Sequence, residues 1–416
     1  MGVVASANVA AAVADAHRRE WGFVLAATVP VIGDLGLAEE AVQDAYARAL
    51  ETWGSRGIPA NAGAWLTTAA RRRALDIHRR AATALRALPK LAEQADATTP
   101  DPFDLEDIPD DRLRLIFTCC HPSLALEAQV ALTLRLLCGL STADVARAFL
   151  VPEATMAARI TRAKKKIKTA RIPYRVPPLE ELPGRVRAVL SVIHLVFTTG
   201  QTAPTGEELM RHDLAERGLE LARLLRVLLP DNPDVGGLLA LILLTDARRD
   251  ARLDEHGQLV LLRDQDRLRW DRQFIDEGAR LLRESLRLQA PSRFTIMAAI
   301  AAVHDQSPSW PETDWAEIVG LYDLLFEVWP TPVVSLNRAI AIGFALGPKE
   351  GLTELDRLTG EPQLAHYGYL SSARAEFLAQ LGRTTAAREA YEEALLLTGN
   401  GVERDFLAAR LDQLGL

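Results

Sequence analysis

The sequence predicts an all-α protein made of several helical units. Hydrophobic residues form 49% of the 416 residues and charged residues 25%, so each unit can bury a core. Ala, Leu and Arg are abundant while aromatic residues reach only 6%, a mixture that favours helices. In Ala38–Ala49 and Ala64–Arg80, apolar residues recur three to four positions apart, which is the helical period. A chain of this length is expected to hold about two to four domains.

The composition gives no sign of disulfides, metals or a membrane. The three cysteines, Cys119, Cys120 and Cys138, are too few for a disulfide framework and are expected to be reduced and buried. The eight histidines are scattered and no C-x-x-C occurs, so we expect no metal or other cofactor. The Ala- and Val-rich start lacks the basic residues of a signal peptide, and Gly236–Leu244 is too short to span a bilayer. A cytoplasmic protein is therefore expected.

Charge is strongly segregated along the chain. The net charge of −7 combines +1 over residues 1–82, −5 over 83–110, +8 over 111–175 and −11 over 176–416. A basic island between acidic neighbours predicts that 111–175 binds a polyanion.

Residues 8–54 are predicted to form helices that break near Gly33–Gly36. A Gly- and Pro-marked loop, 54–63, separates them from a second helix over Ala64–Arg80. Arginines crowd the end of that helix, and Trp65 lies near its start. Cations beside aromatic rings suit single-stranded nucleic acid, although a core tryptophan and solvated arginines would give the same pattern.

A linker is predicted over residues 83–110, which are rich in proline and acidic residues toward their end. It marks the first domain boundary.

Residues 111–172 predict a helix-turn-helix. Two apolar helices, Asp111–Cys120 and Leu124–Leu137, precede Gly139, a plausible helix end. The S-x-x-D pattern Ser141–Asp144 then starts a short helix, and Pro152 forces a turn before a helix from Glu153.

The helix Glu153–Lys168 has an apolar side and a basic side. Met156, Ile160, Ala163 and Ile167 form the apolar stripe, whereas Thr155, Arg159, Arg162 and Lys166 form an adjacent polar stripe that Lys165 extends. Such a division suits a helix that packs on a core and reads the major groove. The alternative is a solvated basic face near a helix C-terminus, where cations are favoured in any case.

The long remainder is predicted to be helical, with an internal repeat. Leu-Gly recurs at 346–347, 381–382 and 414–415, each time after an apolar helix. Further helices follow the first two pairs at Glu350–Leu358 and Ala386–Leu397. A period of about 34 residues is that of tetratricopeptide repeats.

Three segments in order resemble the sigma-70 family, specifically the extracytoplasmic-function (ECF) type. Ala38–Ala49 resembles the family's polymerase-binding helix, and Asn61–Arg80 is similar to the helix that opens and holds the −10 element. Leu140–Lys165 resembles the helix-turn-helix that reads the −35 element. The resemblance implies sigma domain 2 over 1–82 and sigma domain 4 over 111–175.

The resemblance also implies partners and site residues. The partners are core RNA polymerase, through its β′ clamp helices and β flap, and promoter DNA. Glu40, Gln43 and Asp44 would face the β′ clamp helices. The −10 set would be Asn61, Trp65, Arg71, Arg72, Arg79 and Arg80. The −35 set would be Thr155, Arg159, Arg162, Lys165 and Lys166.

The tail departs from minimal members, which end near residue 175. Residues 180–416 resemble the tetratricopeptide-like extension of one subgroup, and the charged run Asp264–Arg272 resembles part of it. That run predicts either a functional surface or a salt-bridged helix start. The extension is expected to regulate activity by binding a partner or by folding back on the DNA-binding domains.

Two other classes compete with this interpretation. A stand-alone helix-turn-helix regulator with a sensing helical domain would leave 38–80 unexplained. An enzyme in 180–416 would need His194, His212, His256 or His304, which show no ligand spacing and no paired nucleophile. We therefore expect no catalytic activity.

Overall fold

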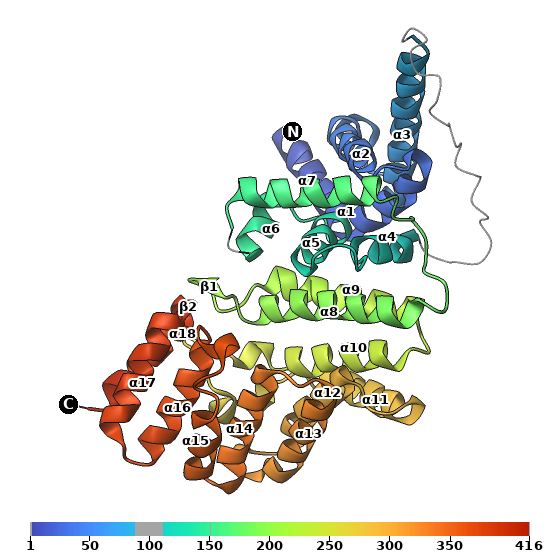
Figure 1. Cartoon of the computed structure of the whole chain (residues 1–416). Coiled ribbons are helices and arrows are strands. Elements are labelled where there is room, and N and C mark those ends of the chain that lie inside the picture. The colour runs from blue at the N-terminus through green and yellow to red at the C-terminus, as the bar shows by residue number, and fades with distance from the viewer. Residues whose placement is uncertain (1, 88–110, 150, 416) are drawn as a thin grey trace. The chain divides into compact units, whose positions relative to one another are not determined.

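The computed structural model describes residues 2–87, 111–149 and 151–415, which form two compact units, Met1–Val192 and Ile193–Leu416. Helices make up nearly all of the regular structure in these residues (Figure 1). The predicted all-α class is therefore confirmed. Among the described helices, none is both long and apolar enough to cross a membrane. Most of the predicted linker, 88–110, lies outside the described residues.

The first unit opens with three helices, α1 (Gly2–Ile32), α2 (Leu35–Arg56) and α3 (Ala62–Ala87). Gly33 ends α1 with a φ of 68°, a conformation that glycine adopts without strain. The Asp34 side chain then caps α2 by accepting hydrogen bonds from the amides of Gly36 and Leu37. The predicted break near Gly33–Gly36 is thus confirmed. Helix α3 continues through residues 83–87, where no proline or glycine interrupts it, so the helix includes the first residues assigned to the linker.

The rest of the first unit holds the helix-turn-helix. Its elements are α4 (Asp111–Cys119), α5 (Leu126–Leu132), the π-helix η1 (Thr133–Leu137), α6 (Thr142–Phe149) and α7 (Glu153–Thr169). Phe117, Leu134 and Leu136 are fully buried in the core between them. All three cysteines are free and buried, as predicted.

Helix α8 (Leu182–Gln201) crosses the boundary between the two units. Its first turn belongs to the first unit, because the buried Arg185 guanidinium donates to the carbonyl oxygen of Phe117. The extension was predicted to start at residue 180. The first turn of α8 packs with the first unit instead, and the second unit begins later, at Ile193.

In the second unit, each helix packs against the one that follows it. Its helices are α9 (His212–Leu228), α10 (Pro233–Asp246), α11 (Arg272–Leu288), α12 (Arg293–Gln306), α13 (Trp315–Val328), α14 (Pro332–Leu346), α15 (Pro348–Asp356), α16 (Gly368–Gln380), α17 (Thr384–Leu397) and α18 (Gly401–Gln413). Every glycine of the three Leu-Gly pairs has a positive φ: 120° at Gly347, 72° at Gly382 and 68° at Gly415. The repeat thus marks helix ends, where a left-handed residue stops the helix.

The start and the end of the second unit meet in a short parallel ladder. Strand β1 (Thr205–Gly206) pairs with β2 (Gly399–Asn400). The Asn400 side chain is completely buried and donates to the carbonyl oxygens of Ala203 and Glu208, at 3.0 and 2.8 Å. Its own carbonyl oxygen accepts from the amide of Glu403 and caps α18.

The charged run Asp264–Arg272 forms a structural junction in the second unit. Asp271 caps α11 by accepting from the amides of Gln273 and Phe274. The Arg267 guanidinium lies 4.5 Å from the ring centre of the buried Trp270 and donates to the carbonyl oxygen of His304. The sequence predicted either a functional surface or a salt-bridged helix start for this run. The cap at Asp271 agrees with a helix start.

Candidate nucleic-acid interface

The helix-turn-helix begins with the cap that the sequence predicts. The Ser141 hydroxyl oxygen accepts from the amide of Asp144 at 3.1 Å, and the Asp144 carboxylate accepts from the amide of Ser141 at 3.2 Å. This reciprocal pair satisfies two amides at the start of α6. Pro152 then stands at the start of α7 with a φ of −56°, and its carbonyl accepts from the amides of Thr155 and Met156. The tight turn between α6 and α7 follows from this geometry.

Helix α7 divides into a buried side and an exposed cationic side. Met156, Ile160, Ala163 and Ile167 are all buried, which confirms the predicted apolar stripe. On the other side, Thr155, Arg162, Lys165 and Lys166 are exposed. Arg159 is half-buried, with its guanidinium 5.7 Å from the ring centre of Phe149. The Lys166 ammonium donates to the carbonyl oxygen of Ser123, so that lysine also ties α7 to the loop before α5.

The predicted −10 residues lie along α3 and the loop before it, but they differ in their contacts. Asn61 caps α3, because its side-chain oxygen accepts from the amide of Ala64 at 2.9 Å. Trp65 is half-buried and meets the buried Trp53 edge to face, with ring centres 5.6 Å apart. The arginines beyond it have exposed side chains: Arg71, Arg72, Arg79 and Arg80. Arg71 also donates to the backbone of α1, at the carbonyl of Ala27.

The predicted polymerase-facing residues share one exposed side of α2. Glu40, Gln43 and Asp44 are all exposed, whereas Ala41, Val42 and Ala45 between and beside them are buried. The Asp44 carboxylate accepts from the Nε of Arg73 at 2.5 Å, which links α2 to α3. The helical period therefore separates a packing side of α2 from a side available to another protein.

One cluster of charged residues was not anticipated. Glu39 is only 4% exposed, and its carboxylate pairs with Arg135 from η1 and Lys164 from α7. These residues lie far apart in the sequence, so no local motif connects them. Periodicity could have indicated that Glu39 is buried, because Glu39, Val42 and Tyr46 follow the helical spacing of the buried side of α2.

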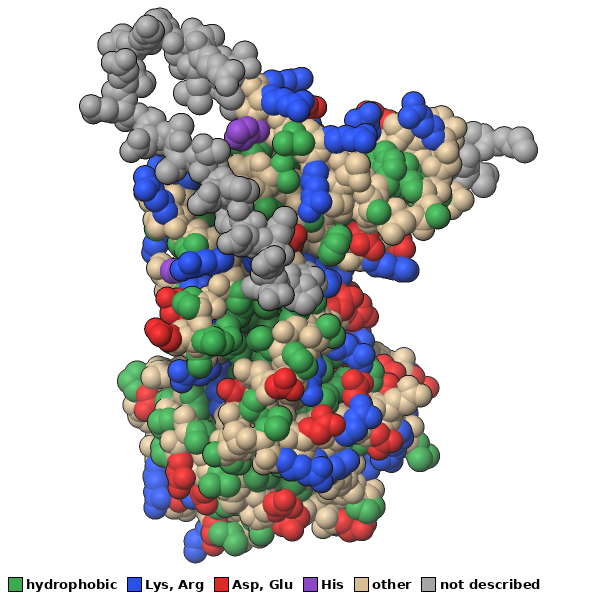
Figure 2. All heavy atoms as spheres, turned by 90° about the vertical axis from the view of Figure 1, so that its right-hand side faces the viewer, with side chains coloured by type: hydrophobic (Ala, Val, Ile, Leu, Met, Phe, Trp, Pro, Cys, Tyr) green, Lys and Arg blue, Asp and Glu red, His purple; other side chains and the backbone are tan. Residues whose placement is uncertain are grey.

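On the face that Figure 2 shows, more Lys and Arg than Asp and Glu side chains are visible over the first unit, whereas the two kinds intermix over the second. In the described residues, no group of three or more His, Cys, Asp and Glu side chains could hold a metal ion. A helix-turn-helix with a cationic second helix, beside a helical bundle that ends in arginines, defines a DNA-binding protein.

Comparison with known families agrees with this class. Residues 22–84 match the family model for sigma-70 region 2, and residues 114–167 match that for sigma-70 region 4. Residues 185–286 match a family of unknown function, DUF6596. An uncharacterized protein of Rhizobium meliloti (strain 1021) is 41% identical over 385 residues, which cover 92% of this chain and 90% of that protein. No solved structure matches the chain.

The chain belongs to the sigma-70 family and is a sigma factor that directs promoter-specific transcription. Its order of region 2, region 4 and a C-terminal domain fits an ECF-like sigma factor with an extension. Sigma-70 regions imply binding to core RNA polymerase and promoter DNA, and proteins of this family are initiation factors rather than enzymes.

Proposed function

We propose that this sigma factor is of the ECF type and reads the −35 element through α7 and the −10 element through α3 and the loop before it. The observation that carries the proposal is the division of α7. Its apolar stripe is buried while Thr155, Arg162, Lys165 and Lys166 remain exposed on the other side. Arginine can pair with guanine edges, and lysine neutralises phosphates, so this face suits the major groove.

For the −10 element, we propose that the end of α3 holds the DNA backbone while the loop captures a base. The exposed Arg72, Arg79 and Arg80 supply cations, and the half-buried Trp65 offers part of its ring for stacking. Asn61 uses its side-chain oxygen as a helix cap, which leaves its amide nitrogen as the donor toward a base.

For core polymerase, we propose that Glu40, Gln43 and Asp44 contact the β′ clamp helices and that region 4 contacts the β flap. The support is their shared exposure on one side of α2. A stand-alone regulator would need only α6 and α7, and the region 2 match over residues 22–84 would have no role in it. We also propose a cytoplasmic location and no catalytic activity.

For the second unit, we propose a tetratricopeptide-like domain that regulates the sigma factor. The support is the run of packed helices with left-handed glycines at the three Leu-Gly pairs. Residues 176–416 carry a net charge of −11 against +8 over 111–175, which suits either a partner or an intramolecular contact.

The test is transcription in vitro with core polymerase and the promoter upstream of the chain's own gene. Changing Arg159 and Arg162 to Ala should abolish transcription while leaving core binding intact. The matched control is Arg175→Ala, an exposed arginine beyond the end of α7. Normal transcription by the double variant would overturn the −35 assignment, and failure of the wild type to bind core polymerase would overturn the mechanism as a whole.

Regulation by the second unit is tested with a chain that ends at Val192. This end keeps Arg185 and its contact with Phe117, which a cut at residue 179 would remove. A changed transcription rate at equal core binding supports regulation, and an unchanged rate contradicts it.

A further inference from the structure

We infer that the second unit binds a small, uncharged molecule with a flat aromatic ring, in a cavity lined by aromatic side chains. The cavity has a volume of about 430 Å³ and lies among α14, α16, α17, α18 and the short helices η3 (Leu262–Asp264) and η5 (Trp310–Glu312). Volumes of about 300–1,000 Å³ are typical of small-molecule sites. This site goes beyond the promoter contacts and the regulatory role proposed above, and it is tested by binding alone.

Two helices present one side each to the cavity. Their lining residues follow the same i, i+3, i+7 spacing, which places each set on one side of its helix. They are Asn337, Ile340 and Phe344 in α14 and Tyr369, Ser372 and Glu376 in α16. The Leu-Gly pairs at 346–347 and 381–382 are 35 positions apart, and so are Asn337 and Ser372. The same position of two successive repeats therefore lines the cavity with a hydrogen-bonding side chain.

Aromatic rings are concentrated in the lining. The chain has only 7 Trp, 6 Tyr and 11 Phe residues, yet six of these line the cavity: Trp310, Phe344, Tyr367, Tyr369, Tyr391 and Phe406. The ring centres of Trp310 and Phe344 are 5.1 Å apart, edge to face, and those of Tyr367 and Tyr369 are 5.0 Å apart. Aromatic rings attract one another in stacked and edge-to-face arrangements, in addition to the area they bury. The lining therefore suits a ligand that is itself a flat ring.

Hydrogen bonds hold two of these rings by their polar ends. The Tyr391 hydroxyl donates to the Glu376 carboxylate at 3.1 Å, and the Tyr369 hydroxyl donates to the Glu403 carboxylate at 2.5 Å. Tyr391 is also only 2% exposed, because its ring belongs to the core that α14 to α18 share. These side chains are thus held in place before a ligand binds, which lowers the entropy that binding costs.

The charged groups of the lining neutralise each other. They are Arg263 and Glu376, whose Nη1 and Oε1 atoms lie 2.9 Å apart. Arg410 gives Glu376 a second guanidinium at 2.7 Å, and Asp264 gives Arg263 a second carboxylate at 3.4 Å. Because both lining charges already have partners, a charged ligand would lose its water without gaining a counter-ion. The paired charges therefore favour an uncharged ligand.

A few uncharged polar groups suit a hydrogen-bonding edge on that ring. Asn337 is exposed and Ser372 is half-buried, and both line the cavity. The Asn337 amide offers a donor and an acceptor, and the Ser372 hydroxyl can act as either. Small-molecule sites typically combine an apolar lining with a few such placed polar groups. The expected ligand class is thus an uncharged aromatic amide or heteroaromatic ring.

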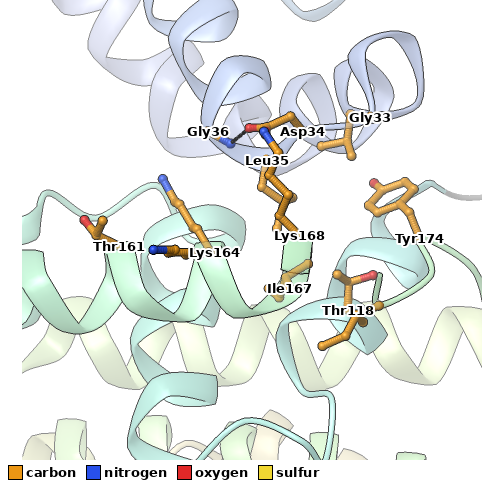
Figure 3. A pocket seen from close by; sticks show the side chains of 13 residues that line it. Gly33, Asp34, Leu35, Gly36, Thr118, Thr161, Lys164, Ile167, Lys168 and Tyr174 are labelled. Carbon is orange, nitrogen blue, oxygen red and sulfur yellow. Dashed lines mark hydrogen bonds and ion pairs between the residues drawn. The ribbon is translucent and has the colours of Figure 1, made fainter. Parts of the chain in front are cut away.

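A second cavity, in the first unit, has a different chemistry. Its volume is about 280 Å³, and Lys164 and Lys168 are among its lining residues (Figure 3). The Lys168 ammonium lies 2.8 Å from the Asp34 carboxylate (Figure 3). Among the described residues that line this cavity, Tyr174 supplies the one aromatic ring. A flat ring would therefore meet one aromatic side chain there and six in the second unit, so the first unit serves as an internal control for binding.

Four probes of similar size separate the ligand classes. Benzamide is flat and uncharged with a hydrogen-bonding edge, benzoate is its anionic counterpart, benzylammonium is cationic, and cyclohexanecarboxamide lacks the flat ring. Each is titrated into the full-length chain carrying 5-fluorotryptophan, and fluorine NMR follows the tryptophan signals. Trp310 lines the cavity, whereas Trp21, Trp53 and Trp65 belong to the first unit, and Trp310→Phe assigns the Trp310 signal. We expect benzamide to move the Trp310 signal, to leave those three unchanged, and to bind about tenfold tighter than each other probe.

Two variants test whether benzamide occupies this cavity. Ser372→Phe places a ring in the cavity and should abolish the movement of the Trp310 signal. Asn337→Ala removes a polar group at an exposed position, where folding does not depend on it, and should weaken benzamide binding by about fivefold. The matched control is Ser335→Ala in the same helix, whose hydroxyl donates to the carbonyl oxygen of Thr331 and lies outside the lining. This control should bind benzamide as the wild type does.

Three results would overturn the inference. If none of the four probes moves the Trp310 signal, the cavity is not a binding site for a flat ring. If benzoate, benzylammonium or cyclohexanecarboxamide binds as tightly as benzamide, the ligand class is wrong. If benzamide binds the Asn337→Ala and Ser372→Phe variants as it binds the wild type, it occupies another place on the chain.

Discussion

The Nε atom of Arg71 donates a hydrogen bond to the carbonyl oxygen of Ala27, 2.9 Å away, and so joins α3 to α1. The neighbouring Arg72 is exposed, with no such contact in the described residues. Two adjacent arginines of the predicted −10 set therefore differ in their contacts: Arg71 binds the backbone of α1, and Arg72 does not.

The first prediction separates these two arginines. Arg71→Ala should destabilise region 2 by about 1 kcal/mol, because a hydrogen bond from a charged donor is lost at a partly exposed site. Arg72→Ala should keep wild-type stability and weaken binding of single-stranded −10 DNA. Thermal melting and binding titrations on both variants provide the check. Equal melting temperatures for the two variants would contradict the structural role of Arg71.

The second prediction concerns the cap of α6. Ser141→Ala removes the hydroxyl that accepts from the amide of Asp144 and should cost about 1 kcal/mol of helix-turn-helix stability. Ser141→Asn should retain most of that stability, because Asn is an equally good cap. Hydrogen exchange of the amides in α6 measures the difference. If the Ala and Asn variants exchange at the same rate, the cap does not stabilise α6.

The third prediction concerns Asn400, which joins the two ends of the second unit. Asn400→Ala leaves the carbonyl oxygens of Ala203 and Glu208 without this donor and should destabilise the unit by about 2–4 kcal/mol. The exposed Asn337 is the matched control, and its change to Ala should have little effect. Denaturant unfolding of the full chain compares the two, and similar midpoints would show that the buried amide is dispensable.

The fourth prediction is a pH dependence set by Glu376. Burial opposes its charge, but hydrogen bonds from Arg263, Gln380 and Arg410 outweigh burial and lower its pKa from 4.5 to about 2. A depressed folded-state pKa stabilises the fold above the unfolded value and loses that effect as pH falls through the folded value. The stabilisation, on the order of 2–3 kcal/mol, should therefore disappear between about pH 4.5 and 2.

Glu376→Gln tests this dependence. The variant should have a lower melting temperature than the wild type at pH 7. This difference in melting temperature should become smaller as the pH falls toward 3. Glu389→Gln, a change at an exposed carboxylate, serves as the control and should track the wild type throughout. If the difference in melting temperature stays constant from pH 7 to pH 3, ionised Glu376 does not provide the pH-dependent stabilisation.

Local signals in the sequence predicted most of the elements because local chemistry decides them. Glycine at 33 and the cap at 34 break the first helices, and the Ser141–Asp144 pattern starts α6 where it was expected. The end of α3 was harder to predict. The Ala-rich residues after Arg80 contain no helix breaker, so α3 continues to Ala87 rather than stopping at the predicted linker.

The helical class, the two-sided α7 and the order of the region 2 and region 4 segments could all be predicted from the sequence. Periodicity and capping depend on neighbours within a few positions, so a single sequence carries them. Three sets of contacts could not be predicted in this way: Glu39 with Arg135 and Lys164, Arg71 with Ala27 of α1, and Asn400 with Ala203. These partners lie 44 to 197 positions apart, and the path of the whole chain through space, rather than any local preference, brings them together.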